Sequence, residues 1–253
     1  MDLNPNRLFR FASPAVFYPL AGRLIPWFAA AAVILGLIGL YEGLIVAPAD
    51  FQQGQTYRII FIHVAASWMG MFIYFLMGVY AVLNLTLRTR LAALMIEALA
   101  PTGAMFTALA LATGSFWGKP AWGTWWVNDA RTLSTLLLLF LYVGYLALHS
   151  AIEDVQRADR AGALLVLIGS VNLPIIYYSV QWWNTLHQGS SINFTRQSSM
   201  TSVMLWAMLF VTLACWAYTI AVALTRVRSK ILWREREARW MAEQGLPAGP
   251  GAR

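Results

Sequence analysis

The chain has 253 residues, of which 59% are hydrophobic and only 11% are charged. This composition is typical of an integral membrane protein. The net charge of +7 is therefore interpreted through membrane topology, and it argues against nucleic-acid binding by a chain that lies mostly in lipid. The single cysteine, Cys215, lies within an apolar run, where packing is its expected role.

Six apolar runs are each long enough to cross a hydrocarbon core about 30 Å thick. We expect the spans at about residues 24–46, 58–87, 91–116, 132–149, 161–183 and 200–227. Pro174 removes a backbone donor inside the fifth run and predicts a kink there. The sequence thus predicts an all-α integral membrane protein with one domain at 1–227. Residues 228–253 form a charged tail with a short surface helix through Trp240.

The Lys and Arg residues predict the orientation of these spans. The chain has 18 of them, and only four lie in segments on the side opposite to the termini, namely Arg58, Lys119, Arg131 and Arg196. The other fourteen lie near the termini and in the turns after the second and fourth spans. By the positive-inside rule both termini are cytoplasmic, and the connections after the first, third and fifth spans face outward.

A Trp-rich stretch, residues 117–131, connects the third and fourth spans. Trp122, Trp125, Trp126 and Asp129 follow the i, i+3, i+4, i+7 spacing of one helical face, and Pro120 suits the first turn of a helix. We therefore expect a short helix at the membrane surface whose tryptophans form a platform for a flat, apolar, partly anionic ligand. The alternative is an aromatic belt that only anchors the neighbouring spans.

The predicted topology separates the three histidines. His63 and His187 lie on the outer side with the Trp-rich stretch, whereas His149 ends the fourth span on the cytoplasmic side as a solvated residue. Two neutral imidazoles facing one another across an aromatic platform would suit the axial positions of a planar iron porphyrin. Arg58 and Arg131 lie at the same level, and guanidinium groups pair well with carboxylates such as haem propionates.

Other kinds of site agree less well with the sequence. A zinc site needs three or four clustered ligands, and only two histidines lie outside. An ion-coupled transporter needs ionisable groups near the middle of the bilayer, and the spans have nearly none there, Glu97 in the third being the clearest candidate. A transmembrane electron-transfer cytochrome usually holds its haem within the bundle rather than at one edge. No phosphate-binding loop is present, so an ATP-driven step must belong to a partner.

The Trp-rich stretch resembles the WWD signature of haem-handling proteins. Its surroundings resemble one branch, the haem-handling protein C of cytochrome c maturation system I. The stretches that carry this resemblance are 47–54, 57–64, 117–131 and 182–189, and the resemblance extends over about residues 20–225. The larger lyase subunit of the same system shares the signature but is far longer, with additional spans.

The resemblance implies a bacterial inner-membrane protein that presents haem b at the periplasmic face. It also implies a lyase-like role, without a hydrolytic or ATPase motif, in attaching that haem to a membrane-anchored haem chaperone. Further implied partners are a small single-span membrane subunit and an ATP-binding-cassette transporter. The alternative, preserved in an older family name, is a haem exporter or permease subunit that moves haem across the membrane.

The resemblance also implies roles for individual residues. The residues it assigns are His63 and His187 as axial ligands of the haem iron, Trp117, Trp122, Trp125, Trp126 and Asp129 as the haem platform, and Arg58 and Arg131 as propionate partners. The sequence departs from the family pattern at Asn128, where a Trp is usual, and at Arg131–Ser134, where Leu and Thr are inverted. Asn128 lies beside the predicted Trp face, so we expect a modest effect on the platform.

Overall fold

The apolar runs form helices because a backbone in lipid must satisfy its hydrogen bonds within the segment. The structure, a computed structural model, describes residues 12–187, 200–247 and 249. In this part of the chain six helical segments are long and apolar enough to cross a membrane. They are Pro14–Val46, Gln55–Leu87, Arg90–Trp122, Ala130–Ala151, Val155–Trp182 and Ser202–Arg234. The prediction of an all-α membrane protein with six spans is confirmed.

Several of these segments contain more than one helical element. The elements are α2 (Pro14–Tyr41) with a π-helical turn η1 (Glu42–Val46), a 3₁₀ turn η2 (Gln55–Ile59) with α3 (Ile60–Leu87), α4 (Arg90–Trp122), α5 (Ala130–Ala151), α6 (Val155–Gly169), α7 (Asn172–Trp182), α8 (Ser202–Arg234) and α9 (Arg239–Glu243). The short helix α9 contains Trp240, where a surface helix of the tail is expected.

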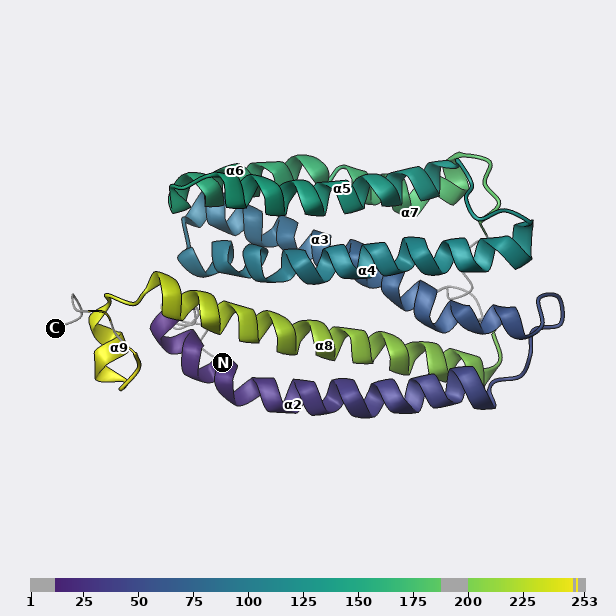
Figure 1. Cartoon of the computed structure of the whole chain (residues 1–253), viewed down its shortest axis with the longest axis horizontal. Coiled ribbons are helices and arrows are strands. Elements are labelled where there is room, and N and C mark those ends of the chain that lie inside the picture. Colours follow the sequence, from purple (N-terminus) through teal and green to yellow (C-terminus); the bar gives the residue numbers. More distant parts are fainter. Residues whose placement is uncertain (1–11, 188–199, 248, 250–253) are drawn as a thin grey trace, which may run out of the picture.

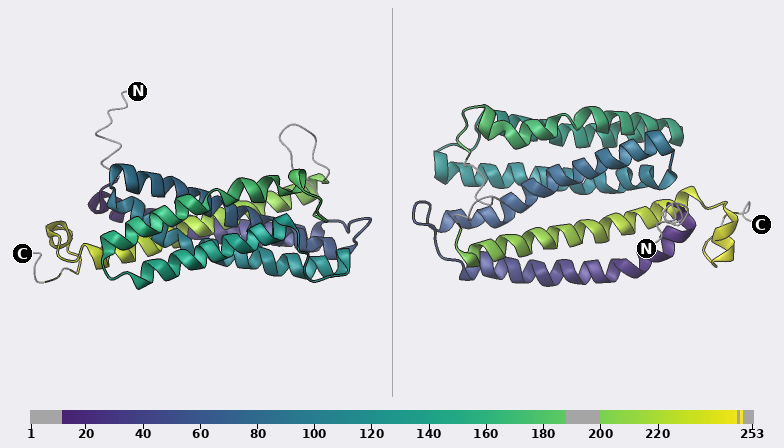
Figure 2. Two further views of the ribbon diagram at one scale, coloured as in Figure 1. Left: turned by 90° about the horizontal axis from the view of Figure 1, so that it is seen from above. Right: turned by 180° about the vertical axis from the view of Figure 1, so that it is seen from behind.

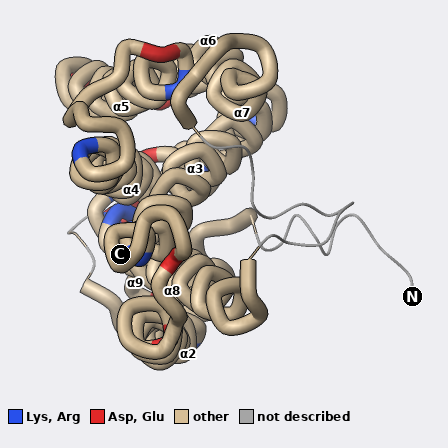
Figure 3. The backbone as a smooth tube through the Cα atoms, turned by 90° about the vertical axis from the view of Figure 1, so that its right-hand side faces the viewer, with Lys and Arg blue, Asp and Glu red and all other residues tan. Residues whose placement is uncertain are grey.

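The spans form an elongated bundle of three pairs (Figure 1). Helix α2 packs along α8, α3 packs along α4, and α5 packs against α6 and α7. The α3–α4 pair lies between the other two pairs, as the view from behind also shows (Figure 2). The end-on view shows that most positions along the helices are uncharged, as the apolar interior of a membrane requires (Figure 3).

Close packing in the middle of the bundle depends on small residues opposite aromatic ones. The Tyr142 hydroxyl donates to the Gly70 carbonyl at 2.7 Å and ties α5 to α3. A Cβ on Gly103 would come within 2.2 Å of the Tyr142 ring, so only glycine admits α5 at this position. Tyr74 stands edge-on to Tyr142 with ring centroids 5.0 Å apart. These contacts fix the positions of α3, α4 and α5 relative to one another, and these three helices carry most of the residues that line the cavities of the bundle.

The fifth span is broken between α6 and α7, and the kink predicted from Pro174 is confirmed. Pro174 is the third residue of α7, where its missing N–H needs no helical partner. Helix α6 ends at Gly169, and Asn172 donates its side-chain amide to the Ser134 carbonyl of α5 at 2.8 Å. Both α6 and α7 pack against α5 on either side of this break.

The helix predicted to start at Pro120 does not form, so this prediction was wrong. Pro120 instead lies in the last turn of α4, which continues to Trp122. Gly123 then adopts the left-handed conformation with φ 78°, and its N–H bonds to the Lys119 carbonyl at 3.0 Å. A glycine in this conformation ends a helix. Residues 124–128 follow as a non-helical segment, and α5 begins directly after Asp129.

Candidate functional site

His63 lies near the start of α3 with its ring against α4. Its Nδ1 is 3.0 Å from the Ala110 carbonyl oxygen and 3.1 Å from the Thr113 hydroxyl. Because a carbonyl can only accept, Nδ1 carries the proton and Nε2 keeps its lone pair. A Cβ on Gly114 would approach the His63 ring to 3.0 Å, so glycine gives the imidazole its room. The ring stands edge-on to Trp117 with centroids 5.7 Å apart.

His187 follows α7 and is held by Asp129 from the start of α5. Its Nδ1 is 2.7 Å from Asp129 Oδ2, and the Thr185 hydroxyl donates to the same carboxylate oxygen. The other oxygen of Asp129 accepts the Thr132 N–H at 2.8 Å and caps α5. Asp129 is only 8% exposed, so the sequence-predicted platform residue lies behind His187 instead of beside the tryptophans. With Nδ1 donating to Asp129, the Nε2 of this imidazole has no hydrogen-bond partner among the residues that the structure describes.

The protonation of this pair follows from its surroundings. Burial lowers the pKa of His187 and outweighs the opposing effect of the Asp129 carboxylate. Burial alone would raise the pKa of Asp129, but hydrogen bonds from Thr185, the Thr132 N–H and His187 bring it below its usual value. The pair is therefore a neutral imidazole and an ionised carboxylate at neutral pH.

The two histidines line the same hollow in the bundle. It consists of a cavity of about 250 Å³ and a smaller one of about 60 Å³. Both are lined by His63, His187, Trp122 and Arg131. The walls come from α3, α4, α5, α7 and α8, from the segment at 124–127, and from Gln53 and Met200. Two imidazoles with free Nε2 atoms, one guanidinium and mostly apolar walls fit a flat metal-containing ligand that carries carboxylates.

The tryptophans are distributed around these cavities. Trp122 lines both and stands edge-on to His187, with ring centroids 5.0 Å apart. Trp117 lines the larger cavity, and Trp125 and Trp126 line the smaller one. Trp125 is 52% exposed and Trp126 is 38% exposed. Two rings therefore come from α4 and two from the segment that follows it, so Trp122, Trp125 and Trp126 do not form one helical face.

The two predicted propionate partners differ in position. Arg131 lines both cavities, and its guanidinium makes no hydrogen bond or ion pair within the described parts of the chain. Arg58 does not line either cavity. Its guanidinium donates to the carbonyls of Gly43 at 3.0 Å and Ala47 at 2.7 Å, at the end of the first span. Arg131 is thus available to an anionic ligand, whereas Arg58 holds backbone carbonyls.

His149 lies at the opposite end of the bundle, as predicted from topology, but it is not solvated. Its side chain is 15% exposed, and Nε2 is 3.0 Å from an Asp159 carboxylate oxygen. Its partner Asp159 belongs to the next helix, α6, ten residues later in the chain. Neither cavity reaches this histidine.

Several residues that support the site were not predicted. Thr185 and Thr113 contact the imidazoles, and Gln53 accepts the Trp117 indole N–H at 2.6 Å. Asn128 accepts the Trp126 indole N–H at 2.8 Å, so the departure from the family pattern supports a neighbouring tryptophan. Of these, Thr185 lies two residues before His187 and Asn128 two residues after Trp126, so only their contacts are local in the sequence.

Comparisons with known proteins agree with the resemblance. The sequence model of a family described as Heme exporter protein C matches residues 7–242. Heme exporter protein C of Escherichia coli K12 is 47% identical over 96% of this chain and 98% of its own length. That of Bradyrhizobium diazoefficiens is 45% identical over 90% and 86%. A putative cytochrome c biosynthesis ccmC-like mitochondrial protein of Marchantia polymorpha is 47% identical over 63% of this chain and 67% of its own length.

Proposed function

The chain belongs to the heme exporter protein C family, and we propose that it binds haem b between His63 and His187 at the periplasmic face of the inner membrane. The family handles haem in cytochrome c biogenesis, and the six spans make the chain a multi-pass membrane protein. The observation that carries the proposal is the pair of histidines that border one hollow with Nδ1 occupied and Nε2 free.

The Nδ1 contacts of both histidines are of the kind that metal-binding histidines make. A histidine that binds a metal through Nε2 generally donates its Nδ1–H to a carbonyl or a carboxylate. Both arrangements occur here, with Ala110 behind His63 and Asp129 behind His187. With haem bound, Nε2 of His63 and Nε2 of His187 would hold its iron, and the residues that line the cavities would hold the porphyrin and exclude water from it.

The remaining walls have separate tasks in this proposal. Trp122, which contacts His187 and lines both cavities, would pack against bound haem, and Trp117, Trp125 and Trp126 would cover its apolar surface. Arg131 binds a propionate, since it is the guanidinium that lines both cavities. Arg58 acts indirectly, because it fixes the end of the first span and thereby the start of α3.

We assign the end with the termini to the cytoplasm. The described chain begins and α8 ends at one end of the bundle, and the α4–α5 connection lies at the other (Figure 1). The fourteen-to-four distribution of Lys and Arg favours this orientation. Reporter fusions after Arg90 are expected to be active as cytoplasmic reporters and fusions at Gly123 as periplasmic ones. The opposite result would put the histidines on the wrong side.

The same geometry supports transfer of the haem to a periplasmic partner. The hollow borders the exposed tryptophans of the 124–128 segment, so a ligand held there is accessible from one face of the membrane. We propose that a membrane-anchored haem chaperone receives the haem covalently at this face. A small single-span subunit and an ATP-binding-cassette transporter complete the complex, and the transporter supplies the ATP-driven step that this sequence lacks.

Haem export is the second candidate, because the relatives carry the name Heme exporter protein C. The two functions separate when haem is supplied outside cells. If the protein presents haem, then cells that lack it, or that carry His63→Ala, fail to load the chaperone even with external haem. If it only exports haem, external haem restores loading. Restored loading in the absence of the protein would overturn the proposal and favour export.

A further inference from the structure

The two cavity histidines differ in what holds their Nδ1 atoms. His63 donates to neutral acceptors, the Ala110 carbonyl at 3.0 Å and the Thr113 hydroxyl at 3.1 Å. His187 donates to a carboxylate, Asp129, at 2.7 Å. Hydrogen bonds to an ionised acceptor are shorter and stronger than hydrogen bonds to a neutral one. The two candidate ligands of the iron are therefore chemically unequal.

Asp129 is arranged to keep its charge for His187. Its side chain is 6% exposed and receives the Thr185 hydroxyl, the Thr132 N–H and the His187 imidazole. In the described parts of the chain no Lys or Arg comes within ion-pair distance of it. All three donors are neutral, and Arg131 interacts with the carboxylate only at longer range, without an ion pair, so no bound cation competes with His187 for the carboxylate. A carboxylate partner of this kind raises the basicity of a ligating imidazole.

We propose that Asp129 is a positioning residue that acts through His187 and makes it the stronger of two unequal axial ligands. It fixes the Nδ1–H tautomer, orients the ring and increases electron donation from Nε2. His63, backed by neutral groups, is then the weaker ligand and the one that yields first when haem leaves for an acceptor. This inference rests on the proposed function, because it requires haem between the two histidines.

Asp129 also caps α5, so its two roles must be separated. Asparagine caps a helix about as well as aspartate. Asp129→Asn therefore keeps the cap and removes the charge. The matched control is Asp154→Asn, because Asp154 caps α6 through the Arg157 N–H at 2.7 Å and contacts no histidine. A change produced by Asp129→Asn and not by Asp154→Asn is an effect on the site.

Haem retention provides the first test. The full-length protein in detergent is loaded with haem, and the rate of haem loss to excess apomyoglobin is measured. Asp129→Asn is expected to accelerate the loss about 10- to 100-fold, as is usual when a partner of a metal-binding histidine is removed. The acceleration should persist in the His63→Ala background and disappear in His187→Ala. Equal acceleration in both backgrounds would overturn the inference, because Asp129 would then act through the fold.

The haem-free protein provides a second test, by NMR with ¹⁵N-labelled histidine. The Nδ1 proton of His187 should resonate further downfield than that of His63, and Asp129→Asn should remove this difference. Indistinguishable Nδ1 resonances in the wild type would contradict the inference. The two failures are separable. Wild-type protein without haem binding overturns the proposed function as well, whereas haem bound by both histidines without coupling to Asp129 overturns only this inference.

Discussion

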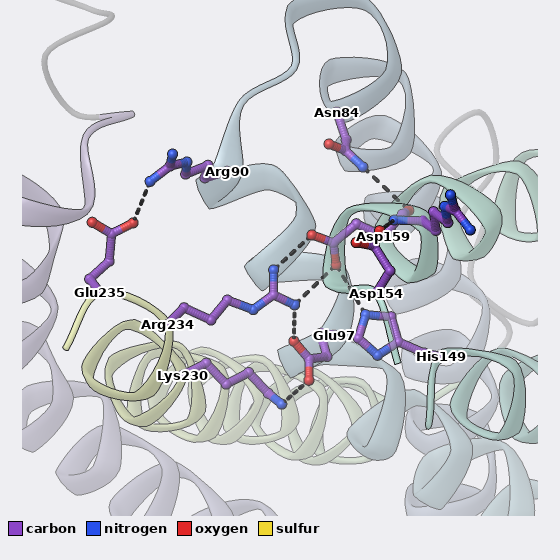
Figure 4. Close-up of polar contacts among 10 residues, drawn as sticks. Asn84, Arg90, Glu97, His149, Asp154, Asp159, Lys230, Arg234 and Glu235 are labelled. Atoms are coloured by element: carbon purple, nitrogen blue, oxygen red, sulfur yellow. Dashed lines mark hydrogen bonds and ion pairs between the residues drawn. The ribbon is translucent and has the colours of Figure 1, made fainter. Parts of the chain in front are cut away.

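The bundle carries a histidine–aspartate pair at each end. The two pairs differ in the ring nitrogen that makes the contact and in the other partners of the aspartate. His187 and Asp129 lie beside the cavities, 2.7 Å apart. His149 and Asp159 lie at the other end, 3.0 Å apart (Figure 4). At the cavity end the imidazole bonds through Nδ1 and keeps Nε2, whereas at the far end it bonds through Nε2.

The aspartates differ in their remaining partners. Asp159 also receives both Nη atoms of Arg234, at 2.7 and 3.0 Å, and Arg234 in turn reaches Glu97, which pairs with Lys230 (Figure 4). The charges there are matched within one network that joins α4, α6 and α8. Asp129 has only neutral donors. In this molecule, the histidine–aspartate pair beside the cavities is thus the one whose aspartate has no ion-paired Lys or Arg in the described chain and whose imidazole bonds through Nδ1.

The largest effect is expected where the charges are matched. Arg234→Met leaves Asp159 and Glu97, which are 15% and 18% exposed, without their shared cation. Breaking a buried pair in this way costs about 3–5 kcal/mol, and the remaining contacts to His149 and Lys230 favour the lower end. The free energy of unfolding in mixed micelles should fall by about 3 kcal/mol, while the folded fraction keeps its haem spectrum.

The control is Arg236, an arginine two residues after Arg234. Arg236 pairs with Glu237 at 3.8 Å, and both side chains are about two-thirds exposed. Arg236→Met should leave the unfolding transition unchanged, because exposed pairs contribute little. A normal unfolding transition in Arg234→Met, or an altered haem spectrum in its folded fraction, would contradict the division of the molecule into a structural and a ligand-binding end.

The next largest effect concerns the tryptophans at the cavity end. Trp122 lines both cavities and packs against His187, whereas Trp125 lines one and is 52% exposed. Trp122→Ala should weaken haem binding by about 2–3 kcal/mol and Trp125→Ala by about 1 kcal/mol. Haem titrations followed by absorbance measure both. A larger loss in Trp125→Ala would mean that the exposed segment, and not the end of α4, is the main platform.

A smaller effect separates the two arginines. Arg131→Gln should weaken haem binding by about 1.5 kcal/mol, the lower range for a hydrogen bond to a charged group. Arg58→Gln should leave the affinity nearly unchanged, because its guanidinium holds the carbonyls of Gly43 and Ala47. The same haem titration compares them. If Arg58→Gln proved the more damaging of the two, the propionate assignment would be reversed.

The smallest effect is a pH dependence in the haem-free protein. Burial lowers the pKa of His187, so the folded chain keeps it neutral while the unfolded chain takes up a proton below about 6.5. The free energy of unfolding should therefore fall as the pH falls below 6.5, by at most about 1.4 kcal/mol per unit for this residue. His187→Gln should flatten this slope. An unchanged slope would show that the imidazole is not kept neutral by the fold.

Part of the site could be predicted from the sequence because the information is local or follows from counting spans. Six apolar runs put His63 and His187 on the same side as the Trp-rich stretch, and the structure places both beside one hollow. The kink at Pro174 follows from a single missing donor. These features depend on composition, order and backbone chemistry, which the sequence states directly.

Other parts could not be predicted, because spacing does not reveal partners far along the chain. The helical spacing of Trp122, Trp125 and Asp129 was coincidental, since Gly123 ends α4 between them. Asp129 meets a histidine 58 residues later, and His63 meets a carbonyl 47 residues later. The guanidinium of Arg58 is held by carbonyls at the end of the first span, 11 and 15 residues earlier in the chain. Gly123, a residue type that often ends helices, was the local signal in the sequence against a helix that continues to Asp129.

The most direct test of the account is the spectrum of the purified protein loaded with haem. We predict a six-coordinate, low-spin haem in the wild type, and a changed spin state or lost haem in both His63→Ala and His187→Ala. Added imidazole should partly restore the low-spin spectrum in each, because it supplies the missing nitrogen, and His149→Ala should match the wild type. Low-spin haem that survives in both cavity variants and disappears in His149→Ala would contradict the assignment of the iron to His63 and His187.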